Sequence, residues 1–299
     1  MNQPAIDIQG LERRFGTVTA VDGLDLRVEP GQVYGLLGRN GAGKTTTLNT
    51  MLGFLAPSAG SVRLLGLDPL QDDLALKRRL GYVPEDLAAY PWMRVGEITR
   101  FSAAFHDRWD HGRVEGLIDR FELPRERKVR QLSKGMRAQL LLALALGHHP
   151  ELLLLDEAGA GLDPLVRQQW QEVLIEVAQD DGTTIFTCSH LVDEVERIAD
   201  RIGVLVGGRL VVDEELDGFK ARCRQVRLWY DGQDSPTLPP AHATKRDGRS
   251  WLLDVRDFGP DWEAACRATE PDRMEIVERS LQDLVVDHLA SPSSLEVRS

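Results

Sequence analysis

A glycine-rich octapeptide near the start of the chain constrains the fold more than any other feature. Residues 38–45 read GRNGAGKT, the apolar residues 33–37 before them predict a buried strand, and residues 45–55 predict the helix that follows. Glycines in such a loop let backbone N–H groups turn towards phosphate oxygens, and the helix directs its positive end at the same charge. The order of strand, loop and helix therefore predicts an α/β fold with a phosphate-binding loop.

The loop supplies the first candidate ligand-binding residues. Lys44 is expected to reach the β- and γ-phosphates of a bound nucleotide, and the Thr45 hydroxyl is expected to help hold Mg²⁺. The remaining candidates are the loop residues and the next helical residue: Gly38, Asn40, Gly41, Ala42, Gly43 and Thr46.

Two acidic residues end a second apolar run further along the chain. Asp156 and Glu157 follow four consecutive leucines, so we expect them at the carboxyl end of a buried strand, where ligands bind in open α/β sheets. Asp156 is expected to hold Mg²⁺ through water, as the carboxylate partner of Thr45. Glu157 is expected to activate the attacking water as a general base. The alternative is an acidic turn after a core strand, without a catalytic role.

Charge and cysteine content exclude several classes of protein. The net charge of -11 argues against electrostatic binding of nucleic acid, which needs a basic face. Cys188, Cys223 and Cys266 are too few and too widely spaced for a disulfide framework or a zinc module, so we expect a reducing cytosol.

The chain shows no membrane-targeting pattern. Its start lacks the basic and apolar regions of a signal peptide, and its longest apolar run, residues 140–146, is far below the roughly 20 residues that a membrane helix needs. If the protein serves a membrane process, another chain is expected to supply the membrane spans.

A length of 299 residues predicts one large domain with a smaller appendage. Within the large domain, residues 87–130 place apolar side chains at helical spacing and indicate an inserted helical subdomain. The composition shifts after about residue 214. There, residues 226–230 and 251–255 predict strands on either side of a loop over residues 231–248, and residues 263–268 and 281–289 predict helices. We expect a small α+β domain whose ligand the sequence does not reveal.

Five elements stand in a recognisable order: the phosphate loop, LSKGM at residues 132–136, LLLLDE at 152–157, GLD at 161–163 and His190. Over about residues 5–215 this order resembles the ATP-binding subunit of an ABC transporter. The resemblance implies a P-loop ABC-type ATPase domain over residues 1–215, with an antiparallel β subdomain, a parallel core sheet and a helical subdomain at about 87–150. Residues 216–299 would form a small α+β accessory domain.

The resemblance also implies roles for residues outside the loop. In a head-to-tail dimer, Ser133 and Gly135 of one subunit would complete the ATP site of the other. This fits their chemistry, since Ser133 is a good helix N-cap and Gly135 permits close backbone approach. His190 would hydrogen-bond the γ-phosphate, and Asp163 would contact the opposite subunit. Phe15 would stack on adenine, with an ordinary core position as the alternative.

Several residues depart from the family pattern. Glu85 stands where the family usually has Gln, and its carboxylate can ligate Mg²⁺. Lys134 and Met136 replace Gly and Gln of the usual LSGGQ, and Ala158 and Gly159 replace Pro and Thr. The signature form, Glu85 and the long tail look most like the drug- and lipid-exporting branch, whose permease is a separate chain.

The segment Tyr90, Pro91, Trp92 and Met93 follows Glu85 closely, where the family's groove receives a coupling helix of the permease. Exposed aromatic and Met side chains suit a partner groove. Ordinary packing within the helical subdomain is the alternative.

The resulting hypothesis is an ATP-hydrolysing exporter subunit that acts as a homodimer or heterodimer on the inner face of the cell membrane, with ATP and Mg²⁺. A soluble ABC ATPase working on DNA or ribosomes is one alternative, and an importer ATPase is the other. The transported substrate cannot be read from the sequence.

Overall fold

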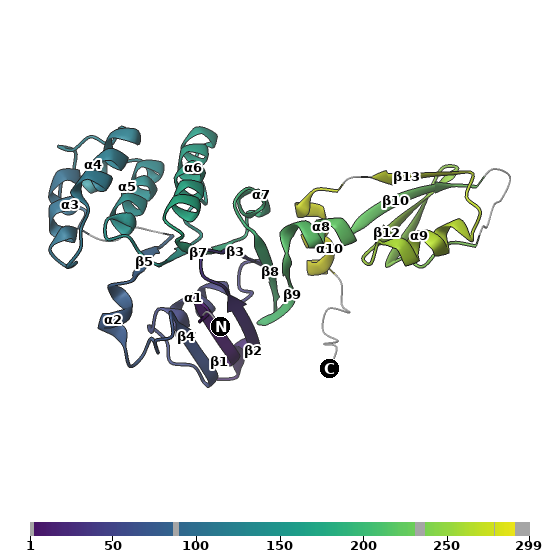
Figure 1. Ribbon diagram of the computed structural model, residues 1–299, viewed down its shortest axis with the longest axis horizontal. Helices are drawn as coiled ribbons and strands as arrows, with labels where there is room; N and C mark the ends of the chain where they lie inside the picture. The colour runs from purple at the N-terminus through teal and green to yellow at the C-terminus, as the bar shows by residue number, and fades with distance from the viewer. Residues whose placement is uncertain (1–2, 86–89, 231–236, 278, 291–299) are drawn as a thin grey trace. The chain divides into compact units, whose positions relative to one another are not determined.

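The computed structural model describes residues 3–85, 90–230, 237–277 and 279–290. The described residues divide into two compact units, one that ends at Asp213 and one that begins at Glu214. The first unit has two sheets and the second has one, and each unit has its own apolar core (Figure 1).

The first unit is built on a six-stranded sheet whose interior strands pair in parallel. β3, β6 and β7 are buried at every position, which explains why they read as continuous apolar runs in the sequence. In spatial order the strands are β5 (Leu80–Val83), β6 (Leu152–Asp156), β7 (Thr184–Ser189), β3 (Val33–Leu37), β8 (Arg201–Val206) and β9 (Arg209–Glu215).

An antiparallel sheet of three strands lies beside this central sheet. Its middle strand is β1 (Ile6–Phe15), which pairs with β2 (Val18–Val28) and β4 (Ala59–Leu64). β2 is continuous over its 11 residues. Gly23 takes a left-handed φ of +66°, so the strand passes the glycine with a register shift and does not end there.

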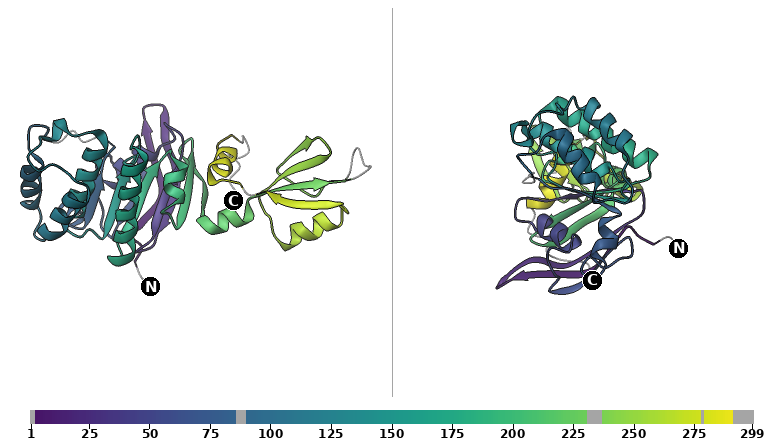
Figure 2. Two further views of the ribbon diagram at one scale, coloured as in Figure 1. Left: turned by 90° about the horizontal axis from the view of Figure 1, so that it is seen from above. Right: turned by 90° about the vertical axis from the view of Figure 1, so that its left-hand side faces the viewer.

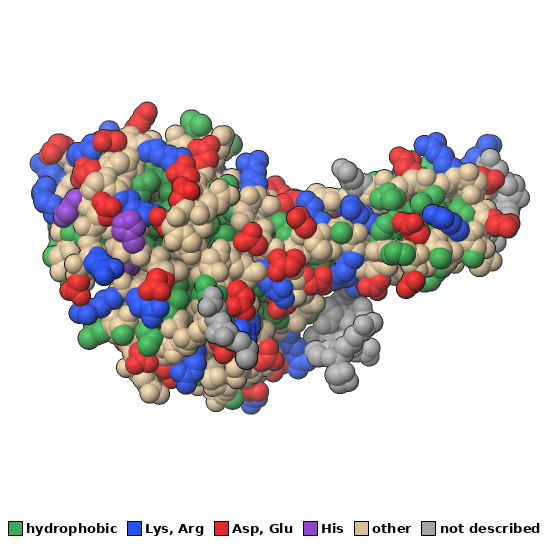
Figure 3. All heavy atoms as spheres, in the orientation of Figure 1, with side chains coloured by type: hydrophobic (Ala, Val, Ile, Leu, Met, Phe, Trp, Pro, Cys, Tyr) green, Lys and Arg blue, Asp and Glu red, His purple; other side chains and the backbone are tan. Residues whose placement is uncertain are grey.

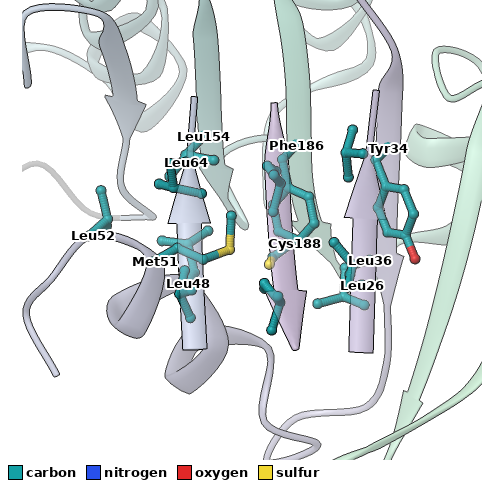
Figure 4. Close-up of a cluster of buried hydrophobic side chains, with 14 of the residues drawn as sticks. Leu26, Tyr34, Leu36, Leu48, Met51, Leu52, Leu64, Leu154, Phe186 and Cys188 are labelled. Atoms are coloured by element: carbon teal, nitrogen blue, oxygen red, sulfur yellow. The ribbon is translucent and has the colours of Figure 1, made fainter. Parts of the chain in front are cut away.

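The main core lies between the two sheets, where α1 (Lys44–Met51) contacts strands of both. Figure 4 shows Leu48 and Met51 of this helix among Leu154, Phe186 and Tyr34 of the central sheet. The rings of Tyr34 and Phe186 stack at 5.5 Å. This packing fixes the start of α1, and hence the phosphate loop, against the ends of the central strands.

Helices α3, α4 and α5 gather on one side of the unit and the antiparallel sheet lies on the other, with the central sheet between them (Figures 1 and 2). Val114 and Ile118 form the buried stripe of α4. The helices of this unit are α2 (Asp73–Lys77), α3 (Val95–Ala103), α4 (His111–Arg120), a 3₁₀ turn at Val129–Gln131, α5 (Lys134–Leu146), α6 (Pro164–Asp180) and α7 (Val192–Glu196).

The second unit is an antiparallel sheet covered by a helix. In spatial order its strands are β11 (Ala243–Asp247), β12 (Ser250–Val255), β10 (Arg224–Trp229) and β13 (Arg273–Val277). Trp262 and Cys266 of α9 (Pro260–Arg267) pack on Val226 and Leu253 of the sheet. The unit also contains α8 (Leu216–Arg222) and α10 (Leu281–Ala290).

The prediction of a loop over residues 231–248 is wrong for residues 243–247, which form β11. β11 is an edge strand whose five residues are all exposed, so it lacks the apolar alternation that identifies a strand. Residues 231–236 lie outside the described part of the chain.

Acidic and basic side chains alternate over the face drawn in Figure 3, without a continuous patch of one sign. Among the described residues, no helix has the length and apolar character needed to cross a membrane.

Candidate functional site

The phosphate loop joins the end of β3 to the start of α1. Gly41 and Gly43 have φ values of +80° and +110°, a region that L residues rarely adopt. A β-carbon on Gly43 would lie 2.4 Å from the carbonyl oxygen of Ala20, so the loop passes too close to β2 for any side chain. Glycine at position 43 is therefore required by both the backbone conformation and the space.

A pocket of about 290 Å³ opens beside this loop. Every lining residue except Ala20 is among the candidates named from the sequence. No motif marks Ala20, which reaches the site only because β2 lies over the loop. The lining is Ala20, Asn40, Gly41, Gly43, Lys44, Thr45, Thr46, Glu85, Glu157 and His190. Gly38 and Ala42 are buried in the loop beneath this lining.

Lys44 is buried in the floor of the pocket. Its Nζ donates to the carbonyl oxygen of Gly38 at 2.8 Å and lies 3.1 Å from Oε1 of Glu157. The side chains of Lys44 and Glu157 are only 5% and 9% exposed, so the two charges compensate each other in a place that water barely reaches.

Glu157 is held from the other side by the residue that follows β7. Its Oε2 lies 2.6 Å from Nδ1 of His190 and accepts the backbone N–H of His190 at 3.2 Å. The Glu157 N–H donates to the carbonyl oxygen of Cys188 at 2.9 Å, and its φ is +49°. The carboxylate thus sits between Lys44 and His190, on a turn with an uncommon backbone conformation.

Asp156 ends β6 next to the helix start. Thr45 Oγ1 donates to Asp156 Oδ1 at 3.5 Å, a long hydrogen bond. Burial raises the pKa of Asp156, and the nearby carboxylates of Glu157 and Glu85 raise it further. A cation placed among these oxygens would relieve the repulsion that raises this pKa.

The candidates for the trans contact cap two neighbouring helices outside the pocket. Ser133 Oγ accepts the Met136 N–H at 3.1 Å at the start of α5. Asp163 Oδ1 accepts the Val166 N–H at 3.1 Å at the start of α6. Both caps are exposed, so the positive ends of both helices face solvent.

The starts of α5 and α6 also touch. A β-carbon on Gly135 would lie 3.2 Å from Cγ1 of Val166, so the glycine allows α6 to approach closely. Lys134 extends towards Gly161, where a β-carbon would lie 3.3 Å from its Nζ. The signature segment and the GLD turn of the same chain therefore form one surface.

Phe15 lies at the end of β1 and does not line the pocket. Its ring is 46% exposed, and the guanidinium carbon of Arg13 lies 4.6 Å from the ring centroid. The alternative of an ordinary core position is wrong, because half of the ring faces solvent. Stacking on adenine stays a prediction.

Glu194 is a residue near the site that the sequence did not mark. It lies on α7, and its carboxylate packs directly against Gly159 in the turn after Glu157. No motif or periodicity reveals this contact, because it depends on how α7 folds back against β7.

The family model described as ABC transporter matches residues 21–160. A bacitracin transport ATP-binding protein of Bacillus licheniformis is 33% identical over 217 residues, which cover 72% of this chain and 71% of the relative. The chain belongs to the ABC transporter ATPase family.

Two further relatives carry export or resistance in their names. A daunorubicin resistance ATP-binding protein of Streptomyces coeruleorubidus is 37% identical, covering 76% of this chain and 73% of the relative. A Nod factor export ATP-binding protein of Ralstonia nicotianae is 34% identical, covering 86% and 83%.

Solved structures agree on the fold of this ABC ATPase. The ATP-binding subunit of an ABC transporter superposes with a TM-score of 0.67 at 25% identity, over 72% of this chain and 92% of that one. A dimeric ATP-binding cassette in a post-hydrolysis state with ADP and Pi has a TM-score of 0.63 at 20% identity, over 71% and 98%.

The chain is thus an ATP-binding and ATP-hydrolysing subunit of an ABC transporter, with the P-loop ABC fold, as the order of motifs predicted. The superposed post-hydrolysis cassette is dimeric, and another superposed cassette is part of the ABC transporter complex cbiONQ.

Proposed function

We propose that this chain drives export through a membrane permease carried by a separate chain, and that ATP binding closes a head-to-tail dimer which hydrolysis reopens. We infer outward transport from the relatives, which are named for bacitracin transport, daunorubicin resistance and Nod factor export. The observation that carries the hydrolytic role is the buried contact of Glu157 with Lys44 on one side and His190 on the other, at the edge of the phosphate-loop pocket.

Hydrolysis then follows from three residues. Lys44 exchanges its contact with Glu157 for the β- and γ-phosphate oxygens, which carry more negative charge. The freed Glu157 carboxylate accepts a proton from the attacking water. His190, whose side chain is 42% exposed, keeps its backbone N–H contact with Glu157 and donates a ring N–H to the γ-phosphate as negative charge develops there.

The site residues fit Mg²⁺. Thr45 and Asp156 offer oxygen ligands that already touch, and Glu85 adds a carboxylate at the mouth of the pocket. A cation bound here would favour the charged form of Asp156, whose pKa is raised by burial and by neighbouring negative charge. When bound, Mg²⁺ would neutralise charge on the β- and γ-phosphates. Among the described residues, no group of three His, Cys, Asp or Glu would hold a metal without the nucleotide.

The remaining predicted residues act across the dimer. Ser133 and Gly135 at the start of α5 would present a helix N-terminus to the γ-phosphate bound by the other subunit. Asp163, exposed beside them, would contact that subunit. We propose that the partner cassette is a second copy of this chain.

An exposed aromatic row provides the surface for the permease. Tyr90 lies at ring distances of 5.8 Å from Trp92 and 4.8 Å from Phe101, and Phe101 lies 5.0 Å from Phe105. The side chains of Trp92 and Phe105 are 63% and 67% exposed, which suits a partner surface better than internal packing. This contact would hold the chain at the inner face of the cell membrane. Residues 86–89 lie outside the described part of the chain.

ATP turnover by the purified chain tests the hydrolytic role. Lys44→Ala removes the cation that contacts both the loop and Glu157, and chelation of Mg²⁺ removes the proposed partner of Thr45 and Asp156. Each is expected to lower turnover by about 100-fold or more. Lys77→Ala removes an exposed lysine that pairs with Asp73 on the surface, and should leave turnover unchanged. Full turnover in the Lys44 variant, or in the presence of a chelator, would contradict the proposed mechanism.

A further inference from the structure

A buried carboxylate outside the nucleotide pocket packs against the turn that follows Glu157. Glu194 lies on α7, and only 9% of its surface is exposed. A β-carbon on Gly159 would lie 2.5 Å from Oε2 of Glu194, closer than real atoms approach. The carboxylate thus fills the space that a side chain at position 159 would need. The glycine that replaces the family's usual Thr therefore makes room for Glu194.

Arg167, near the start of α6, is the counter-ion of this carboxylate. Its Nε lies 3.1 Å from Oε1 of Glu194, an ion contact without the alignment of a hydrogen bond. Its Nη2 donates to the carbonyl oxygen of Leu162 at 3.2 Å, directly before Asp163. Arg167 thus connects Glu194 to the GLD turn.

The charge on Glu194 is costly unless it is compensated. Burial raises the pKa of Glu194, and Arg167 opposes this shift. The nearby charge of Glu157 raises this pKa further, and His190 lowers it. A buried charge that loses its partner destabilises its surroundings, so the pair resists separation of the segments that carry it.

We propose that Glu194 and Arg167 are a positioning pair for ATP hydrolysis, which holds the Gly159 turn and the GLD turn against the loop that carries His190. This inference rests on the proposed roles of Glu157 and His190. Neither member of the pair lines the nucleotide pocket, so both act through the residues they hold in place.

The distance that the pair would protect is the 2.6 Å contact between Glu157 and His190. Glu157 stands two residues before Gly159, and His190 stands four residues before Glu194. A displacement of about 1 Å between catalytic groups can lower a rate about 100-fold without changing substrate binding. Loss of the pair should therefore reduce kcat and spare the KM for ATP.

Steady-state ATP turnover of the full chain tests this. Glu194→Gln and Arg167→Gln are each expected to lower kcat about tenfold or more and to change KM less than about threefold. The double variant should be about as slow as the slower single variant, because the two residues act as one unit. Arg120→Gln is the matched control. It removes a surface ion pair between Arg120 of α4 and Glu176 of α6, the helix that also carries Arg167, and should leave kcat and KM unchanged.

A second variant pair tests the coupling between positions 159 and 194. Gly159→Ala places a methyl group where the carboxylate lies, and should lower kcat with little change in KM. Adding Glu194→Asp shortens the acid by one methylene and should restore part of the rate. A merely structural role would show the loss and the rescue in thermal unfolding and would leave the kcat of the folded protein unchanged.

The inference would be overturned if Glu194→Gln and Arg167→Gln left kcat unchanged. It would also be overturned if kcat fell only in proportion to the loss of folded protein, as measured by thermal unfolding. Glu157→Gln in the same assay separates it from the proposed function. If Glu157→Gln abolishes turnover while the Glu194 variant is normal, only the positioning pair fails. If Glu157→Gln keeps full turnover, the proposed mechanism itself fails.

Discussion

At the scale of single residues, His148 is a group whose charge state the fold strongly controls. It follows α5, is 7% exposed, and shares a hydrogen bond of 3.1 Å between its Nε2 and the Leu80 carbonyl oxygen. Its ring stacks on His106 with centroids 4.1 Å apart. Burial, with a smaller contribution from His106, lowers the pKa of His148 from 6.5 to about 4. The folded chain therefore keeps this histidine neutral.

This shift predicts a loss of stability in acid. Between pH 6.5 and about 4 the unfolded chain binds a proton at His148 that the folded chain does not, so the free energy of unfolding should fall as the pH falls through this window. The loss is at most about 3 kcal/mol at its lower end. It is absent above pH 6.5, where both states are neutral.

Urea unfolding at pH 7.5 and pH 5 measures the effect. His148→Gln keeps an N–H donor for the Leu80 carbonyl oxygen and removes the titrating group, so its stability should depend less on pH than that of the wild type. His111→Gln, at the exposed start of α4, is the control. An equal pH dependence in all three proteins would contradict the account.

Individual contacts in the site could not be predicted from the sequence. Lys44 and Glu157 are separated by over a hundred residues, and only the packing of α1 against β6 and β7 brings them to 3.1 Å. Gly159 and Glu194 also come together only through tertiary packing, because α7 folds back against β7. The motifs predicted which residues would gather, because each motif ends a buried strand or begins a helix at the same edge of the sheet.

At the scale of elements, buried strands were predicted best. Val33–Leu37 forms β3 with the expected bounds, and the leucines at 152–155 lie within β6. These strands are covered on both faces, so their apolar runs are continuous. Exposed edge strands such as β11 have no such pattern and were missed.

The caps of α5 and α4 give a matched pair of substitutions. Ser133→Ala and Asp110→Ala each remove a side chain that accepts a backbone N–H at a helix start, at 3.1 Å and 2.9 Å. Each should lower the free energy of unfolding by about 1 kcal/mol. Only Ser133→Ala should also suppress ATP turnover, because only Ser133 is proposed to face the nucleotide of the other subunit.

Chemical unfolding and ATP turnover, measured on both variants, separate the two roles of Ser133. If Ser133→Ala hydrolyses ATP as fast as Asp110→Ala does, then Ser133 is an ordinary cap and the proposed trans contact is wrong.

At the scale of the whole molecule, the two units have separate cores. Trp262 of α9 is buried in the second core, and its Nε1 donates to the Pro240 carbonyl oxygen at 2.5 Å. Trp262→Ala should destabilise the second unit by about 3–5 kcal/mol. The affinity for ATP should stay unchanged, because the first unit holds every residue of the phosphate-loop pocket.

Limited proteolysis with and without Trp262→Ala, alongside nucleotide titration, measures both effects. Cleavage should increase within residues 214–296 alone. A parallel loss of ATP affinity would mean that nucleotide binding depends on the second unit.

The central claim is that ATP closes a dimer of this chain, and Glu157→Gln tests it most directly. The amide cannot accept the water proton, so the variant should bind ATP without hydrolysing it. By light scattering with saturating ATP and Mg²⁺, it should form a stable dimer of twice the 33.4 kDa chain mass. The same variant with Lys44→Ala should stay monomeric. A monomer of Glu157→Gln under saturating ATP would contradict the account.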